Sequence, residues 1–127
     1  MNGTRIVFDT NAIINLLNQK YDLLSLGINV DEAQLLTSVI VRMELLSKRN
    51  IQADEEQDIQ EFLDNLVVVP LDESVEKKSV EIRRISSLKL PDCIVAATSI
   101  VSGALLLTDD SDLLGLSWPG LRTQSIL

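Results

Sequence analysis

Four acidic residues lie where apolar, strand-like runs give way to helices. Asp9 directly follows one apolar run and Asp110 closely follows another, while Glu44 and Asp92 fall in the early turns of predicted helices. The carboxyl ends of parallel strands share one edge of a sheet, and α/β proteins place their sites just outside that edge. We therefore expect the four carboxylates to face one crevice.

Carboxylates that converge in this way repel one another. Two unit charges ~4 Å apart repel by ~4 kcal/mol at an effective dielectric constant near 20. The cluster therefore needs protonation or a cation. A bound divalent ion would offset the repulsion, lower the pKa of a coordinated water and stabilise the oxygen that leaves a phosphodiester. The pattern predicts metal-dependent hydrolysis and leaves open whether one ion or two take part.

The composition narrows the chemistry further. The chain of 127 residues has no histidine and one cysteine, Cys93. Without histidine, serine–histidine and cysteine–histidine nucleophiles and imidazole-rich zinc sites are excluded, which leaves oxygen ligands for Mg²⁺ or Mn²⁺. A single cysteine excludes an intramolecular disulfide and suits a reducing compartment, so we expect the cytoplasm. The sequence has no signal-peptide pattern and no run of ~18 apolar residues. We therefore expect neither export nor membrane insertion.

The formal net charge of −8 weighs against nucleic-acid binding, which normally draws its affinity from a basic surface. A divalent cation at the acidic site would reverse the local sign. The densest basic stretch contains Lys77 and Arg84, seven residues apart and so on one face of a predicted helix. We hypothesise that this face guides RNA phosphates toward the carboxylates; solvated surface charge is the simpler interpretation.

Strand and helix patterns alternate along the chain. Apolar residues make up 46% of the sequence and aromatic residues only 3%, so the core must consist of leucine, isoleucine, valine and alanine. The pattern predicts strands at residues 5–8, 35–39, 67–69 and 104–107, with an edge strand at 125–127. It predicts helices from Thr10, after Ser38, and at residues 54–66, 73–88 and 90–102. This alternation indicates an α/β fold with a mostly parallel central sheet of four to five strands, in a single domain spanning residues 1–127.

Four sequence blocks resemble PIN-domain nucleases, and VapC-type toxins most closely. They are Asp9-Thr10-Asn11, Arg42-Met43-Glu44-Leu45-Leu46, Leu90-Pro91-Asp92 and Thr108-Asp109-Asp110-Ser111-Asp112, and they occur in the family's order. The resemblance implies a three-layer α/β/α sandwich and Mg²⁺- or Mn²⁺-dependent cleavage of RNA. It also implies a homodimer and a cognate antitoxin that holds the enzyme inactive.

The resemblance also implies roles for individual residues. Asp9, Glu44, Asp92 and Asp110 match the catalytic acids, and Asp112 matches a frequent fifth acid. The metal ligands would then be Asp9, Asp92, Asp110 and Asp112. Asn11 and Thr108 match polar positions that orient ligands or water.

Each acid also has a purely structural interpretation. Asp9 could cap a helix, Asp92 could complement a helix dipole, and Asp110 and Asp112 could form a turn, the role to which we assign Asp109. Two competing functions stay open: a catalytically silent PIN-like module that binds RNA or protein, and a Mg²⁺-binding receiver-type signalling domain. The second is disfavoured because no acid ends the strand at residues 67–69 and no lysine follows the strand at 104–107.

Overall fold

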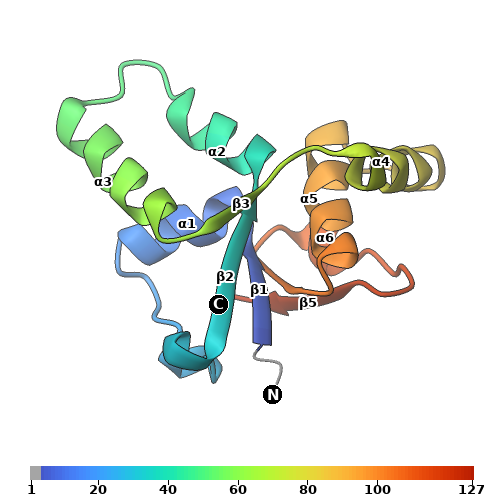
Figure 1. Cartoon of the computed structure of the whole chain (residues 1–127), viewed down its shortest axis with the longest axis horizontal. Helices are drawn as coiled ribbons and strands as arrows, with labels where there is room; N and C mark the ends of the chain where they lie inside the picture. Colours follow the sequence, from blue (N-terminus) through green and yellow to red (C-terminus); the bar gives the residue numbers. More distant parts are fainter. Residues whose placement is uncertain (1–3) are drawn as a thin grey trace.

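A parallel sheet of five strands separates two layers of helices in the computed structural model, which describes residues 4–127. The strands are β1 (Thr4–Phe8), β2 (Ala33–Ser38), β3 (Val67–Val69), β4 (Leu105–Thr108) and β5 (Arg122–Ser125). The helices are α1 (Thr10–Leu17), α2 (Val39–Leu46), α3 (Ala53–Asp64), α4 (Glu73–Ile85), α5 (Leu90–Val101) and α6 (Ser111–Leu114). Helices α1 to α3 lie on one side of the sheet and α4 to α6 on the other (Figure 1). The predicted α/β/α architecture and parallel sheet are confirmed.

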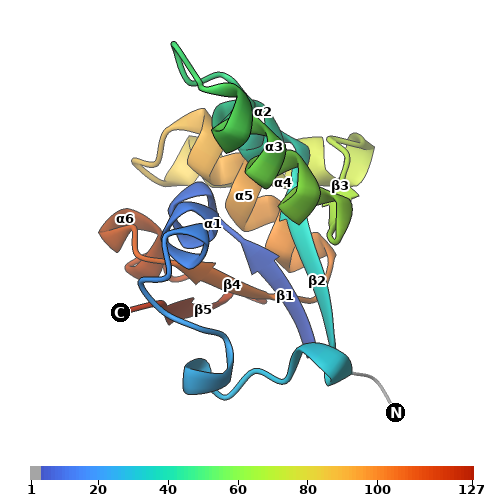
Figure 2. The same ribbon diagram turned by 90° about the vertical axis from the view of Figure 1, so that its left-hand side faces the viewer.

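The order of the strands creates a switch point at β1. The sheet runs β3-β2-β1-β4-β5, and every neighbouring pair is parallel. From β1 the chain proceeds first to β2 and β3 on one side, then crosses to β4 and β5 on the other, as Figure 2 shows. In open α/β sheets the crevice beyond the carboxyl ends at such a point is the usual binding site. Phe8 pairs with Leu107 across β1 and β4, so the residues that follow both strands meet there.

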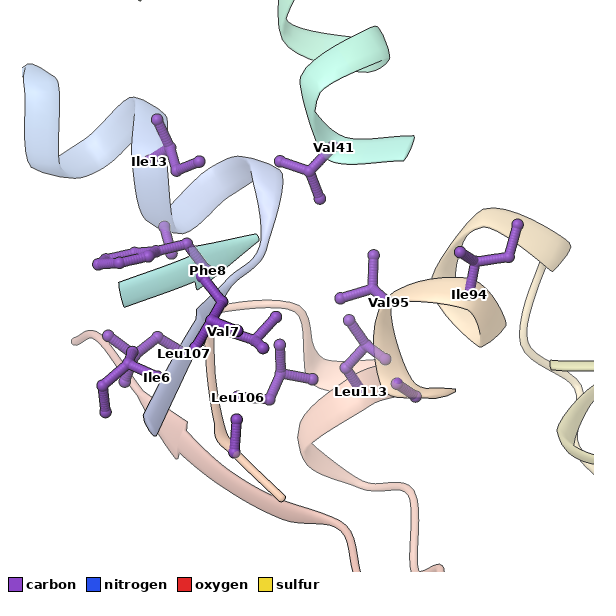
Figure 3. Packing of buried hydrophobic residues seen from close by; sticks show 14 of the residues in the cluster. Ile6, Val7, Phe8, Ile13, Val41, Ile94, Val95, Leu106, Leu107 and Leu113 are labelled. Carbon is purple, nitrogen blue, oxygen red and sulfur yellow. The ribbon is translucent and has the colours of Figure 1, made fainter. Parts of the chain in front are cut away.

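Side chains alternate between the two layers along the central strands. In the close view of Figure 3, Phe8 lies toward Ile13 of α1, whereas Val7 lies toward Val95 of α5. All four of these side chains are buried, and Phe8 also packs edge-on against Phe62 of α3 with ring centroids 5.8 Å apart. A parallel sheet covered on both faces needs strands that are apolar on both sides, as β1 is from Ile6 to Phe8. Burial of these side chains holds β1 in place between the two layers of helices.

Helix starts are set by local hydrogen bonds. The side chain of Ser38 accepts a hydrogen bond from the N–H of Ile40 and caps α2, so Val39 belongs to the helix and not to the strand predicted at residues 35–39. Asp72 caps α4 in the same way, through the N–H of Val75. Pro91 occupies the first turn of α5, where its missing N–H costs nothing.

Several predicted boundaries were wrong. The edge strand lies at Arg122–Ser125 and not at 125–127, because all four residues of this strand at the rim of the sheet are polar and no apolar run marks it. Helix α4 ends at Ile85, three residues short of the prediction, where Ser86 adopts an extended conformation. Helix α6 and two short 3₁₀ turns, Leu24–Leu26 and Val30–Glu32, were not predicted. Among the described residues, every helix is too short or too polar to cross a bilayer.

We expect Leu106→Ala to destabilise the protein by about 2–5 kcal/mol, because Leu106 is fully buried in the middle of the sheet and its loss leaves a cavity. Urea denaturation followed by circular dichroism measures this. Ile85→Ala is the matched control, since Ile85 is 79% exposed and its loss should change stability by less than about 0.5 kcal/mol. Equal effects of the two substitutions would contradict the core assigned here.

Candidate active site

Asp9 is the most buried of the acids at the carboxyl ends of the strands. It follows β1 directly and is only 5% exposed. One carboxylate oxygen, Oδ1, accepts a hydrogen bond from the N–H of Thr10 (2.8 Å). The other, Oδ2, accepts from the hydroxyl of Thr108 (2.7 Å) and from Nδ2 of Asn11 (3.1 Å). Burial raises the pKa of Asp9 and the charge of Asp110 adds to the rise, while the hydrogen bonds act in the opposite direction.

Thr108 connects Asp9 to Asp110. Its hydroxyl, which is fully buried at the end of β4, donates to Asp9 and accepts a hydrogen bond from the N–H of Asp110 (2.9 Å). The side chain of Asp110 in turn accepts from the N–H of Asp112 (2.8 Å) and caps α6. The turn after β4 is therefore tied to the turn after β1. Thr108 thus contacts two of the acids, and its predicted role in orienting ligands or water stays a prediction.

Glu44 reaches the same edge from α2. Its Oε1 accepts a hydrogen bond from the hydroxyl of Thr10 at 3.1 Å, across 34 residues of sequence. Thr37, at the end of β2, holds the neighbouring backbone by donating to the carbonyl of Phe8 at 2.8 Å. The first turn of α1 thus links Glu44 to Asp9, since Thr10 contacts both.

The pKa of Asp92 is raised by burial and by the charges of the other acids. Asp92 lies in the first turn of α5, and its pKa is raised to about 6, with burial as the largest cause. The charges of Asp110, Asp9, Glu44 and Asp112 contribute further to this rise, in that order. Four carboxylates from three separate segments therefore act on one side chain: Asp9 after β1, Glu44 in α2, and the turn that holds Asp110 and Asp112.

The acids approach one another without forming a closed ligand set. Within residues 4–127, no group of three or more acidic, cysteine or histidine side chains is arranged to hold a metal ion. The charge of one acid raises the pKa of another over distances longer than the ~2.0–2.6 Å of a Mg²⁺–oxygen or Ca²⁺–oxygen bond. The acids can therefore raise the pKa of Asp92 without being close enough to share an ion. Like charges that converge in this way repel one another until a cation offsets them. The donors are oxygens only, which fits Mg²⁺ or Mn²⁺ in ligand type.

Sequence reasoning missed three side chains at this edge. Thr10 orients Glu44, and Asn15 and Asp109 contact each other at 3.3 Å. The sequence offers only weak indications of these contacts. Thr10 is a hydroxyl residue next to Asp9, and Asn15 lies one helical turn after Asn11 and so on the same face of the helix. Nothing in the sequence marked Asp109 as different from an ordinary turn residue.

The basic residues proposed to guide RNA lie on α4. Lys77 pairs with Glu73 at 2.9 Å, one helical turn away, and both side chains are exposed. Arg84 forms no ion pair within the described part of the chain, residues 4–127. Exposed pairs of this kind are weak, so Lys77 can exchange Glu73 for another anion at little cost.

A second surface feature lies between α1 and α3. It is a groove of about 620 Å³ whose lining includes the apolar residues Ile14, Leu17 and Ile59. The acidic residues Asp54, Glu55, Asp58 and Glu61 also line it, and none of Asp9, Glu44, Asp92 and Asp110 does. An apolar groove with acidic walls is complementary to a segment that carries both apolar and basic side chains.

Comparison with known proteins agrees with this architecture. The family model of the PIN domain matches residues 6–118. The chain therefore belongs to the PIN-domain family. The comparison with curated proteins finds no match.

Solved structures with the same fold come from several bacteria. A chain in a toxin–antitoxin complex from Klebsiella pneumoniae is 27% identical, with a TM-score of 0.74 over 93% of this chain and 96% of that one. A chain in DNA-bound VapBC from Salmonella typhimurium is 19% identical, with a TM-score of 0.80 over 98% and 99%. VapBC2 from Rickettsia felis, bound to a promoter DNA fragment, gives 19% identity and a TM-score of 0.80 over 96% and 98%.

We expect Asp92→Asn to raise the melting temperature by about 3 °C at pH 8 in EDTA, because it removes a repelled charge. The folded protein holds the Asp92 proton up to about pH 6, whereas the unfolded chain releases it near 3.8. Stability is therefore lost as pH rises through that window, and the advantage of the variant should vanish below about pH 4.

The control is Asp31→Asn, an exposed acid just before β2 and hence at the opposite edge of the sheet. It should leave the melting temperature unchanged at both pH values. A variant Asp92→Asn that is less stable than the parent at pH 8 would show that the acids do not repel at this position.

Proposed function

We propose that this protein is a metal-dependent endoribonuclease that acts as the toxin of a toxin–antitoxin pair. The observation that supports this best is the convergence of the charges of Asp110, Asp9, Glu44 and Asp112 on Asp92. They meet at the switch point of a parallel sheet, where α/β proteins bind their ligands. A structural role for any single acid would not require the others to be near it.

The metal ligands in this proposal are Asp9, Asp92, Asp110 and Asp112, with Glu44 completing the catalytic acids. When bound, Mg²⁺ or Mn²⁺ supplies Lewis acidity that lowers the pKa of water and offsets the negative charge of a phosphodiester. Lewis acidity of this kind suits a chain that contains no histidine to act as a general base.

The chain's own neutral side chains orient these acids. Thr108 and Asn11 donate to Oδ2 of Asp9, which fixes the plane of its carboxylate. Thr10 donates to Glu44, which holds that longer side chain toward the crevice. Such partners are important because a ligand must be held close to its productive position for the site to work.

RNA is the proposed substrate, although the net charge of −8 opposes long-range attraction of any polyanion. Lys77 and Arg84 on α4 are proposed to guide its phosphates locally. Affinity for RNA should then depend on the bound cation more than on the protein surface.

The proposed regulator is an antitoxin with a basic, amphipathic segment. Its support is the toxin–antitoxin complexes among the similar structures and the apolar groove with acidic walls between α1 and α3. The acidic crevice offers a second place for an arginine or lysine of the same partner. Both surfaces are acidic and favour basic side chains, so one basic segment of the partner could contact both.

The proposal further includes a homodimer, a single PIN-like domain over residues 1–127, and a cytoplasmic location. A second copy would cover large apolar side chains that α4 and α5 leave exposed, such as Ile85 and Leu90, which are 79% and 50% exposed. Free RNA and a reduced Cys93 both fit the cytoplasm.

The alternative is a catalytically silent PIN-like module that binds RNA or protein. Two observations favour it: the acids do not form a closed ligand set within residues 4–127, and the net charge is strongly negative. The experiment that follows separates the two functions.

We expect the purified protein to cleave single-stranded RNA in Mn²⁺ and not in EDTA. Asp9→Asn should lower the rate by about 100-fold or more, because even outer partners of a metal ligand are worth 10–100-fold. Asp31→Asn removes the same charge at the far edge and should cleave like the parent. Rates on a fluorescent RNA oligonucleotide measure this. Equal cleavage by parent and Asp9→Asn would indicate a contaminant, and cleavage by neither would favour the silent module.

We expect Asp58→Lys to weaken the antitoxin complex about tenfold, mainly through slower association, because it reverses a charge in the wall of the groove. The partner tested is the small protein encoded beside this one, produced together with it, and its binding is measured by surface plasmon resonance. Glu32→Lys is the control, an exposed acid outside the groove. A complex unaffected by Asp58→Lys would place the antitoxin elsewhere.

A further inference from the structure

The turn after β4 is held to α1 by two asparagines that are one helical turn apart. Oδ1 of Asn11 accepts a hydrogen bond from the backbone N–H of Asp109 (2.9 Å). Nδ2 of Asn15 donates to Oδ2 of Asp109 (3.3 Å) and also to the carbonyl of Asn11 (2.9 Å). Residues four apart lie on the same helical face, so both amides point at one turn. Asp109 is thus fixed by its backbone and by its side chain.

The carboxylate of Asp109 contacts α1, where its Oδ2 accepts the hydrogen bond from Asn15. Its negative charge also acts on Tyr21 of the neighbouring loop. Tyr21 itself donates to the carbonyl of Ala12 in α1 (2.7 Å), so Asp109 lies on the α1 side of the turn. Asp110 is extended, and successive side chains of an extended backbone point to opposite sides. Fixing Asp109 on one side therefore aims Asp110 at the other.

We propose that Asn15 and Asp109 are positioning residues that hold Asp110 in the acid cluster. This inference rests on the proposed nuclease function. The pair holds the turn after β4 in place before any cation binds. Binding of the cation then costs less conformational entropy, because Asp110 is already in position. Because Asn15 is neutral, the contact adds no positive charge that would compete with the cation. The 94 residues between the pair make it specific to the folded chain.

The test is a double-mutant cycle on the full chain with Asn15→Ala, Asp109→Ala and the two combined. Isothermal titration with Mn²⁺ gives the metal affinity, RNA cleavage gives kcat and KM separately, and thermal melting gives stability. We expect each single variant to weaken Mn²⁺ binding and to lower kcat by about tenfold, with KM unchanged. The combined variant should be no weaker than either single one, because both remove the same contact.

The exchanged pair, Asn15→Asp with Asp109→Asn, reverses donor and acceptor. It should recover much of the Mn²⁺ affinity that each single change loses, which general destabilisation would not do. Gln60→Ala, a matched loss of an exposed amide on α3, should bind Mn²⁺ like the parent.

Three outcomes would overturn the inference. Asn15→Ala with a lowered melting temperature and parental Mn²⁺ affinity would make the pair merely structural. Loss of binding in Asp109→Ala, with parental binding in Asn15→Ala, would make Asp109 a ligand. A parent that neither binds Mn²⁺ nor cleaves RNA would overturn the proposed function and this inference with it, whereas the first two outcomes leave that function standing.

Discussion

Mutual repulsion among carboxylates is the constraint on which the carboxyl edge of this sheet depends. Neutral donors hold the acids in place: the hydroxyls of Thr10 and Thr108 and the amide of Asn11 contact Asp9 or Glu44. In the described part of the chain the ion pairs lie elsewhere, on the α2–α3 connection and along α4. A lysine among the acids would cancel the repulsion but would also occupy the place of a cation. Because neutral groups orient the acids, the negative charge of the cluster stays available for a cation.

The buried core offsets the cost of this arrangement. Burial and neighbouring charges raise the pKa of Asp9 and of Asp92, so both side chains oppose folding when they are ionised. Buried side chains adjoin both acids: Val7 and Phe8 precede Asp9, and Ile94 and Val95 follow Asp92. The packed sheet and helices hold the acids in a position that the acids alone would not adopt.

Much of this edge could be predicted from the sequence because its acids follow apolar runs. Asp9 and Asp110 come after β1 and β4, so the periodicity that predicts the strands also places the residues after them. Contacts between distant segments leave no such pattern, which is why the bond from Thr10 to Glu44 was missed. The last strand was misplaced for a related reason: Arg122–Ser125 is half exposed, and its position is set by pairing with β4 and not by its own composition.

The structural interpretation is confirmed for Asp9 and Asp110, and it is compatible with the functional role proposed for both acids. Asp9 caps α1 through the N–H of Thr10, and Asp110 caps α6 through the N–H of Asp112. A cap uses one acceptor site of one carboxylate oxygen, and an ionised carboxylate has about four. The same backbone N–H groups carry the positive end of the helix dipole, which partly stabilises an ionised acid in a crowded crevice. The bond from the N–H of Thr10 opposes the rise in the pKa of Asp9, and the two caps tie the positions of both acids to the first turn of the helix that follows each of them.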